Sequence, residues 1–467
     1  MSSTQSRPSA GSPAAGASLA AVVLLLGLSL ATGGSSQEPG AGALATQVLA
    51  VPALGWAGWQ LLQGGRLGRL AWAWLASAAM LMAIPLLQLL PMQAGGEARA
   101  ALASDLALFG VAVPSRVSVL PSATAGAAMS LLPALAVFAL TLGLPASARR
   151  WLPTAIAGLA LASLLLGLAQ LGAPRESVLN PYPQWTPAMG GFFANPNHQA
   201  TLLVVAATLA TAGVLTALGS WLPGRPHRGP VLVGWACTLL VTLVALPLTG
   251  SRAGLILGVV ACALVMVALL PGWSGPRTGR ALLVAAATVA GLGLLAAIRW
   301  MRSSAVDELR SPLRSLAVEI GERFAPLGSG MGSFVPVFEQ EAPAWLLMGE
   351  YVNHAHNEYA QWWLEGGVPA LLAMLLVAAL LALSLRSLLR QPADARAPGL
   401  AALVALGAVL AHSVVDYPLR TPALVAIAAA LAGVVAGQAV QGGEARNRAG
   451  RRGVAASSHR LQGDMTS

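Results

Sequence analysis

Histidine and arginine are the residues of this sequence whose types and positions could support acid–base chemistry and anion binding. His354 and His356 lie two positions apart, beside Asn357 and Glu358. Residues at i and i+2 do not share a helix face, so one imidazole is expected to face a site and the other to face away. Since neutral imidazole accepts protons near pH 7, His356 is the candidate general base, with an ordinary structural histidine as the alternative. The other three residues are candidates for substrate contact.

Metal binding is the other chemistry that histidines could serve. The sequence has no HExxH pattern and no carboxylate triad beside the histidine pair, and Cys237 and Cys262 lie separately in apolar runs. We therefore expect no metal, no cofactor and no disulfide framework.

Three arginines lie where charge-based topology rules do not favour them. Arg252 follows a Thr-Gly-Ser turn between two apolar runs, and Arg310 and Arg314 open the polar part of a long loop. Arg252 reads either as a side chain reaching lipid head groups or as an anion ligand. The planar guanidinium fork matches phosphate oxygens, so all three are candidate phosphate contacts.

Three further polar segments interrupt the apolar sequence. Residues 180–199 (NPYPQWTPAMGGFFANPNHQ) read either as an ordinary loop or, through Asn195 and Asn197, as a contact for a sugar or head group. Residues 328–332 (GSGMG) read either as a simple turn or as a nest of backbone amides for phosphate. Asp416, in a short turn near the end of the chain, is one more candidate for substrate contact.

These residues must be positioned by membrane-spanning helices. Of 467 residues, 56% are hydrophobic and 9% are charged, whereas soluble domains carry about 25% charged residues. Because a helix needs about 20 mostly apolar residues to cross a bilayer, the sequence predicts an all-α polytopic membrane protein with about twelve transmembrane helices. The predicted spans are 16–33, 43–62, 70–91, 126–146, 151–171, 199–219, 230–250, 253–271, 280–300, 367–388, 399–415 and 422–441.

Arginine placement predicts the orientation. All 27 basic residues are arginine, and they gather in alternate short loops and in the C-terminal tail, which places both termini in the cytoplasm. We therefore predict a multi-pass protein of the bacterial inner membrane. It has a disordered cytoplasmic tail (1–15), a transmembrane domain (16–441) and a basic cytoplasmic tail (442–467). Nucleic acid is not a predicted partner, because the arginines punctuate apolar runs.

The non-cytoplasmic side then receives a 66-residue loop, 301–366. Within it, the spacing of apolar residues in Leu309–Phe324 predicts an amphipathic helix lying on the membrane or on the helix bundle. A second helix is expected to begin at His356 and to run towards the span at 367. Arg252 and Asp416 are predicted on this same side, so the candidate chemistry gathers there.

Four motifs resemble those of the O-antigen ligase and polymerase superfamily. They are GFFANPNH at 191–198, SRAG at 251–254, PLGSGMGSF at 326–334, and HAHNEY at 354–359 followed by GGVP at 366–369. They cover about 180–370, in the family's order and on the predicted outer side. Ala360 and Ala370 stand where leucine and glycine are usual. Both changes concern packing more than chemistry, and they weaken assignment to the ligase branch.

The resemblance implies a metal-independent membrane glycosyltransferase whose donor is a glycan linked through diphosphate to undecaprenol. By motif match, His356 takes the place of the catalytic histidine, and Arg252 and Arg310 those of diphosphate-binding arginines. The implied acceptor is a hydroxyl of lipid A core, of a growing polysaccharide or of a protein. Residues 416–420 (DYPLR) are similar to an element of polymerase-like members.

A multi-span transporter or flippase of glycan or lipid-linked substrates is the competing class. Transporters carry ionisable groups or broken helices near the bilayer midplane, in two related halves. The predicted spans carry no internal charge and the two halves are unlike, so the sequence favours the transferase.

Overall fold

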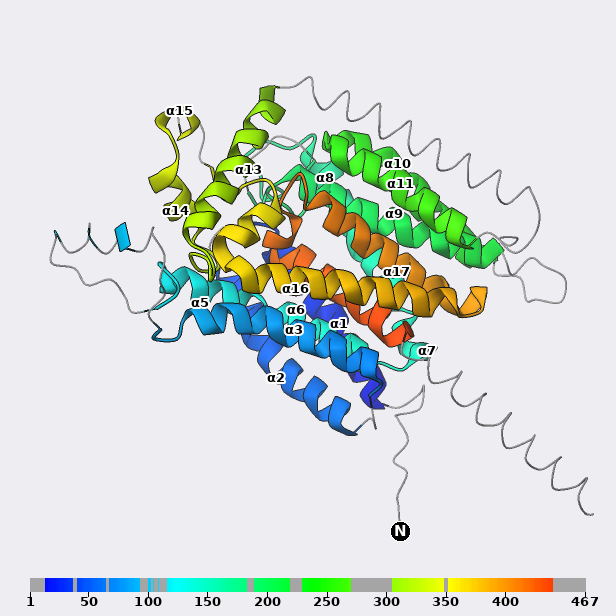
Figure 1. Ribbon diagram of the computed structural model, residues 1–467. Coiled ribbons are helices and arrows are strands. Elements are labelled where there is room, and N and C mark those ends of the chain that lie inside the picture. Colours follow the sequence, from blue (N-terminus) through cyan, green and yellow to red (C-terminus); the bar gives the residue numbers. More distant parts are fainter. Residues whose placement is uncertain are drawn as a thin grey trace, which may run out of the picture.

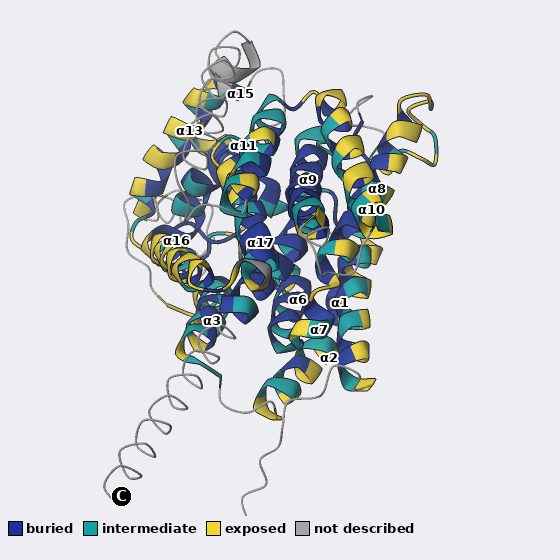
Figure 2. Cartoon of the chain, turned by 90° about the vertical axis from the view of Figure 1, so that its right-hand side faces the viewer, coloured by how far each residue is buried: buried dark blue, intermediate teal, exposed yellow. Residues whose placement is uncertain are grey.

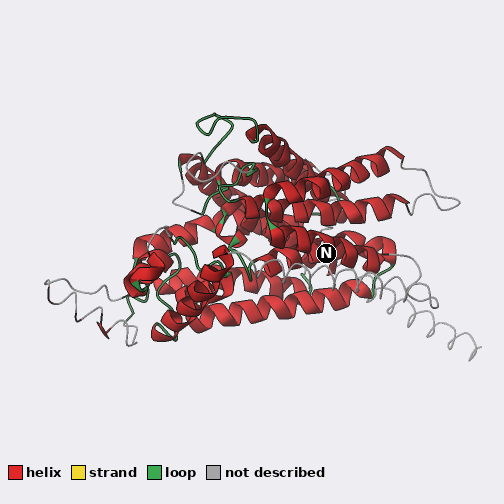
Figure 3. Ribbon diagram, turned by 90° about the horizontal axis from the view of Figure 1, so that it is seen from above, coloured by secondary structure: helices red, strands yellow, loops and turns green. Residues whose placement is uncertain are grey.

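A computed structural model of the chain describes residues 13–36, 40–63, 67–92, 116–182, 189–218, 229–269, 305–347 and 352–439, with isolated residues between 100 and 108. These residues form helices and turns, without a strand among them (Figure 3). The described part is therefore all-α, as the sequence predicts.

Eleven helices within these ranges are long and apolar enough to cross a membrane. They are α1 (Pro13–Thr32), α2 (Ala41–Gln63), α3 (Arg69–Gln88), α5 with α6 (Pro121–Ser130 and Leu132–Gly143), α7 with α8 (Ala146–Arg149 and Leu152–Gln170), α9 (Pro196–Leu218), α10 with η2 (Gly229–Ala245 and Leu246–Thr249), α11 (Arg252–Leu269), α16 (Glu358–Leu389), α17 (Ala393–His412) and Pro422–Ala439. Eleven predicted spans coincide with them, and the chain is a multi-pass membrane protein. The predicted span 280–300, most of the tail 1–15 and the tail 442–467 lie outside the described residues.

Helix α9 forms the centre of the bundle, and nearly its whole length is buried (Figure 2). It is rich in alanine and threonine, whose small side chains let neighbouring helices approach closely. Gly254 of α11 packs directly on Ala200 of α9, where any side chain would collide. On the outside, α10 and α16 expose leucines such as Leu240 and Leu375, as expected of helices that face lipid.

Helix α16 begins at Glu358, two residues after the helix start predicted at His356. It corrects the end of the predicted loop, because residues 358–366 continue into the span, and both Glu358 and Glu365 are buried there. The helix is broken at Gly367, whose φ of 57° and ψ of −146° are not helical. Glycine tolerates this left-handed conformation because it has no Cβ.

The turn at 328–332 packs into the break in α16. Ser329 N–H donates to the Leu364 carbonyl and Gly330 N–H to the Glu365 carbonyl, each at 2.9 Å. The next amide, that of Met331, donates to the side chain of Gln88 in α3 at 2.9 Å. These three N–H groups donate to protein acceptors and are not available to a phosphate. The interpretation of 328–332 as a simple turn therefore holds, and its interpretation as a phosphate-binding nest is wrong.

Helices α13 (Ala305–Arg323), α14 (Phe334–Glu341) and α15 (Ala344–Leu347) lie together at one end of the bundle (Figure 1). Leu313, Ala317 and Ile320 line one face of α13 and belong to an apolar cluster with Phe338 and Leu364. The predicted amphipathic segment therefore packs on the bundle, against the first turns of α16.

Two backbone contacts anchor the segment that leads into α9. The amide of Gln170, at the end of α8, pairs with both backbone groups of Gly191 at 2.8 Å. The Ala194 N–H donates to the Gly34 carbonyl at 3.1 Å, just beyond the end of α1. These contacts fix the position of the Asn-Pro-Asn sequence from which α9 starts.

Candidate functional site

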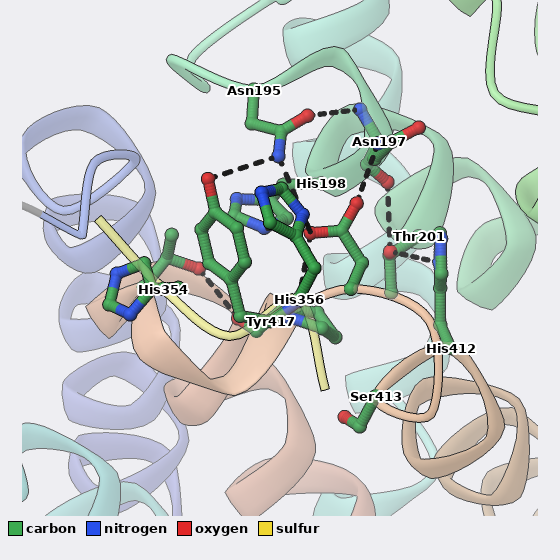
Figure 4. Close-up of polar contacts among 12 residues, drawn as sticks. Asn195, Asn197, His198, Thr201, His354, His356, His412, Ser413 and Tyr417 are labelled. Carbon is green, nitrogen blue, oxygen red and sulfur yellow. Dashed lines mark hydrogen bonds and ion pairs between the residues drawn. The ribbon is translucent and has the colours of Figure 1, made fainter. Parts of the chain in front are cut away.

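Four of the six histidines of the chain meet around a single carboxylate and a single phenol, those of Asp416 and Tyr417 (Figure 4). They come from three parts of the fold: the start of α9, the segment before α16 and the end of α17. They are His198, His354, His356 and His412. Helices distant in sequence therefore assemble one polar centre at one end of the bundle.

Asp416 is fully buried and is held by hydrogen bonds on both oxygens. Asn197 donates to Oδ2 at 2.6 Å, and the backbone N–H of Tyr417 donates to Oδ1 at 2.8 Å. Burial by itself raises the pKa of this carboxyl, but the imidazoles of His198, His356 and His412 more than offset it and hold the pKa well below its usual range. Donors around the charged form act in the same direction. The side chain is therefore a carboxylate at neutral pH.

His356 is the accessible histidine of the centre. Its side chain is 26% exposed, whereas that of Asp416 is 1% exposed, and its Nδ1 lies 3.8 Å from Asp416 Oδ1. Burial lowers the pKa of the imidazole, the Asp416 carboxylate raises it, and the charges of Arg310 and His198 lower it again. The net pKa is below its ordinary value, so the ring is neutral at pH 7.

The backbone at His356 differs from the prediction. Neither His356 nor His354 belongs to a helix, because α16 begins two residues later with Asn357 as its N-cap. His356 has a φ of 48°, in the left-handed region that few residues other than glycine adopt. Non-glycine residues in this conformation gather at functional sites, where the surrounding structure enforces it. Both imidazoles nevertheless lie against the Tyr417 ring, and that of His356 is the more exposed of the two.

His354 has a different environment. Its ring is buried against Tyr417, with ring centroids 4.2 Å apart, and its Nδ1 contacts the side-chain amide of Gln361 at about 3.2 Å. Burial and the nearby Arg420 charge lower its pKa well below the ordinary value. His354 therefore supports the centre from within rather than facing a substrate.

The arginines predicted to bind anions occupy different positions. Arg310 is half-buried, and its charge lowers the pKa of His356, after burial and Asp416, which places it beside this centre. Arg252 is the first residue of α11, next to the start of α9. Arg314 is exposed on α13. The charge of Arg310 thus acts on His356, whereas Arg314 is exposed to solvent.

Most amide and carboxylate candidates have structural partners. Asn197 holds Asp416, and Asn357 caps α16 and donates to the Val414 carbonyl at 2.8 Å. Glu358 is buried and accepts from the Leu419 N–H at 2.5 Å. These three residues organise the site, so their predicted role in contacting substrate is not supported by their geometry.

Asn195 remains partly exposed at the edge of the centre. Its side chain accepts from the Asn197 N–H at 2.9 Å and lies 3.5 Å from both the Tyr417 hydroxyl and Asp416 Oδ1. Asn353 reaches the same hydroxyl at 3.4 Å. Burial and the Asp416 charge raise the pKa of Tyr417 to about 12, so the phenol stays protonated.

Three members of the centre were not predicted individually: His198, His412 and Tyr417. His412 Nδ1 lies 2.8 Å from the Thr201 hydroxyl of α9, which in turn donates to the Asn197 carbonyl. Tyr417 contacts three of the four imidazole rings. A signal was present, since His198 and Tyr417 lie in the motifs at 191–198 and 416–420 and His412 lies near the outer end of a predicted span, but no spacing links the three.

The arrangement combines a neutral, accessible imidazole, an ionised carboxylate behind it and a cationic side chain nearby. Such a set can accept a proton from a hydroxyl and stabilise an anionic leaving group. Among the described residues, no group of three or more His, Cys, Asp or Glu side chains is placed to hold a metal ion.

Comparison with known protein families gives one match. Residues 237–375 match the model of the family described as O-antigen ligase. This match supports the resemblance of the chain to the O-antigen ligase and polymerase superfamily. No curated protein matches the chain.

The part of the chain matching the O-antigen ligase family contains most of the candidate residues. It begins in α10, includes Arg252, Arg310 and the 353–357 segment, and ends in the second part of α16. Asp416 and the start of α9 lie outside it, yet the fold brings them against His356. The two departures from the family signature, Ala360 and Ala370, are both buried in apolar clusters.

Proposed function

We propose that the protein transfers a glycan from undecaprenyl diphosphate to an acceptor hydroxyl at the outer face of the bacterial inner membrane. The match of residues 237–375 to the O-antigen ligase family supports a ligase or polymerase activity in general terms. The observation that carries the chemistry is the accessible, neutral His356 next to the ionised Asp416.

In the proposed reaction, the acceptor oxygen bonds to the anomeric carbon of the donor sugar. The bond from that carbon to the diphosphate oxygen breaks, and the lipid diphosphate leaves with the electron pair. His356 takes the acceptor's proton. The carboxylate on its Nδ1 side favours the tautomer protonated at Nδ1, which leaves Nε2 to act as the base.

Arg310 and Arg252 are proposed to bind the diphosphate. Negative charge grows on the leaving oxygens as the glycosidic bond breaks, and preorganised guanidinium groups stabilise it. Asp416 orients the imidazole and stabilises its protonated form. No step of this scheme requires a metal ion or a cofactor.

Orientation and acceptor complete the proposal. Both termini lie in the cytoplasm, so that residues 301–357 and the turn after α17 lie outside. The acceptor is a sugar hydroxyl, either on a growing polysaccharide or on lipid A core. The sequence 416–420 favours the polysaccharide.

The test is donor consumption by the purified protein in liposomes without an ion gradient. His356→Ala should reduce the rate by about 10²–10⁴-fold at unchanged expression, the range typical of a general base. His354→Ala, a buried neighbour, should be milder per folded molecule, and EDTA should have no effect. The proposal fails if His356→Ala keeps more than roughly a tenth of the activity, or if His354→Ala is the more damaging.

A further inference from the structure

The first turns of α16 carry a buried polar face. Glu358, Gln361 and Glu365 stand at i, i+3 and i+7, so they line one side of the helix. All three are at most 3% exposed. Burying a polar stripe of this kind costs free energy unless each group has a hydrogen-bond or ion-pair partner.

The stripe connects the two segments that carry the reacting pair. On one side, Gln361 contacts His354, two residues before His356. Gln361 Nε2 also donates to Glu365 Oε1 at 3.2 Å. On the other side, Arg420 Nη1 donates to Glu365 Oε2 at 2.6 Å. Arg420 ends the 3-10 turn η3 (Pro418–Arg420), which directly follows Asp416 and Tyr417.

We propose that Glu365 and Arg420 are positioning residues, whose ion pair holds the turn carrying Asp416 at its working distance from His356. A test of this role by the rate of glycan transfer rests on the proposed function. Glu365 also accepts the Phe334 N–H at 3.3 Å, so the same carboxylate ties the outer helix α14 to the site.

Stability alone does not account for this pair. Burying two charges costs desolvation free energy that a single contact rarely repays. Two nitrogens of the Arg420 guanidinium, Nε and Nη2, are buried without a hydrogen-bond partner. An ion pair kept for stability would be expected to satisfy them. Glu358 secures the other part of the turn through the Leu419 N–H, so the pair is not needed merely to attach it.

The charges of the pair do not themselves set the titration of His356. The groups that face His356 are Asp416 and Tyr417 of the last turn, His198 of α9, Arg310 of α13 and His354 of its own segment. Of these, Asp416, Arg310 and His198 act on its pKa together with burial, and neither Glu365 nor Arg420 does. A change in the titration of His356 on altering the pair would therefore report movement of Asp416.

The decisive variant removes both charges at once. Glu365→Gln with Arg420→Met keeps an acceptor for Phe334 and Gln361 and leaves no uncompensated buried charge, so it should fold and melt near the wild-type temperature. The matched control neutralises the half-buried ion pair of Arg323 and Glu341 on α13 and α14 in the same way.

Two properties are measured on each protein. The first is kcat and KM for the lipid-linked donor. The second is the pH dependence of the modification of His356 by diethyl pyrocarbonate in the absence of donor, followed by peptide mass spectrometry. We expect the double variant to lose at least about tenfold in kcat, with little change in KM. The modification midpoint should move to lower pH, in the direction of Asp416→Asn, while the control changes neither readout.

A folded double variant with kcat within about twofold of wild type and an unmoved midpoint would overturn the proposal. If the double variant does not fold, Glu365→Asp replaces it, since it retains both charges but withdraws the carboxylate by one methylene, and the same two outcomes apply. If wild-type protein consumes no donor, the proposed function fails, and the positioning role is judged on the modification midpoint alone.

Discussion

Replacing Asp416 by asparagine tests whether the charge of this carboxylate assists His356, the proposed general base. The amide can still accept the Tyr417 N–H, but the negative charge 3.8 Å from His356 Nδ1 is lost. Two unit charges about 4 Å apart interact by about 1 kcal/mol in water and about 4 kcal/mol at an effective dielectric constant of 20. His356 is about one-quarter exposed and lies between these limits. Because the imidazole becomes protonated as the acceptor is activated, transfer should slow by about 5- to 1000-fold.

The pH dependence gives the sign of the effect. Asp416 raises the pKa of His356, so removing its charge lowers that pKa further. Activity requires the neutral imidazole and is lost as pH falls through this pKa. The acidic midpoint of the kcat/KM profile should therefore move to lower pH, by about one pH unit or more, in Asp416→Asn.

The assay is the initial rate of donor consumption in proteoliposomes, measured from acidic to neutral pH. Glu339→Gln, a change of the same kind on the exposed side of α14, is the control and should leave the profile unchanged. Partial misfolding would lower the rate at every pH without moving the midpoint. An Asp416→Asn profile with an unchanged or higher midpoint would refute the assignment of His356 as a base assisted by this carboxylate.

Two further predictions concern the donor and the orientation. Arg252→Lys and Arg310→Lys should each raise KM for the donor by roughly tenfold or more, because an ammonium group cannot reproduce the guanidinium fork. Arg314→Lys, on the exposed side of α13, should be neutral; near-normal kinetics in the first two variants would rule out diphosphate binding. In a cysteine-free background, Gln340→Cys, exposed on α14, should react with an impermeant maleimide in intact spheroplasts. Reaction only after lysis would reverse the proposed topology.

The sequence predicted the membrane fold because a crossing helix needs a long apolar run, and such runs are visible locally. For the same reason it placed the start of the membrane span at 367, although the spanning helix α16 begins at Glu358. Glu358 and Glu365 make residues 358–366 polar, although those groups are buried against partners from other helices. Hydropathy depends on the residue type alone, whereas a charged side chain is buried only where a partner forms a hydrogen bond or ion pair with it. The partners, Leu419 and Arg420, lie more than fifty positions away.

The candidate site was predicted in part for a related reason. His356 belongs to a motif that is visible in one stretch of chain, and the structure places it 3.8 Å from Asp416, where the charge of Arg310 also lowers its pKa. His198 ends the motif at 191–198, but no spacing links it to His412, because both reach Asp416 only through the packing of α9 against α17. The left-handed backbone at His356 was equally invisible, since nothing in the residue type requires it.

The distribution of exposure within the centre bears on how two unlike substrates could meet there. Asp416, His198 and His412 are each at most 1% exposed, whereas the side chain of His356 is about one-quarter exposed. A carboxylate shielded from water acts more strongly on a neighbouring imidazole than one in solvent. The base itself must nevertheless be reached by a hydroxyl. Placing His356 just before a membrane-spanning helix meets both requirements: the bundle supplies the buried carboxylate, and the outer segments leave one ring open. Under the proposed function, this junction is where a donor held in the bilayer and an acceptor arriving from outside can react.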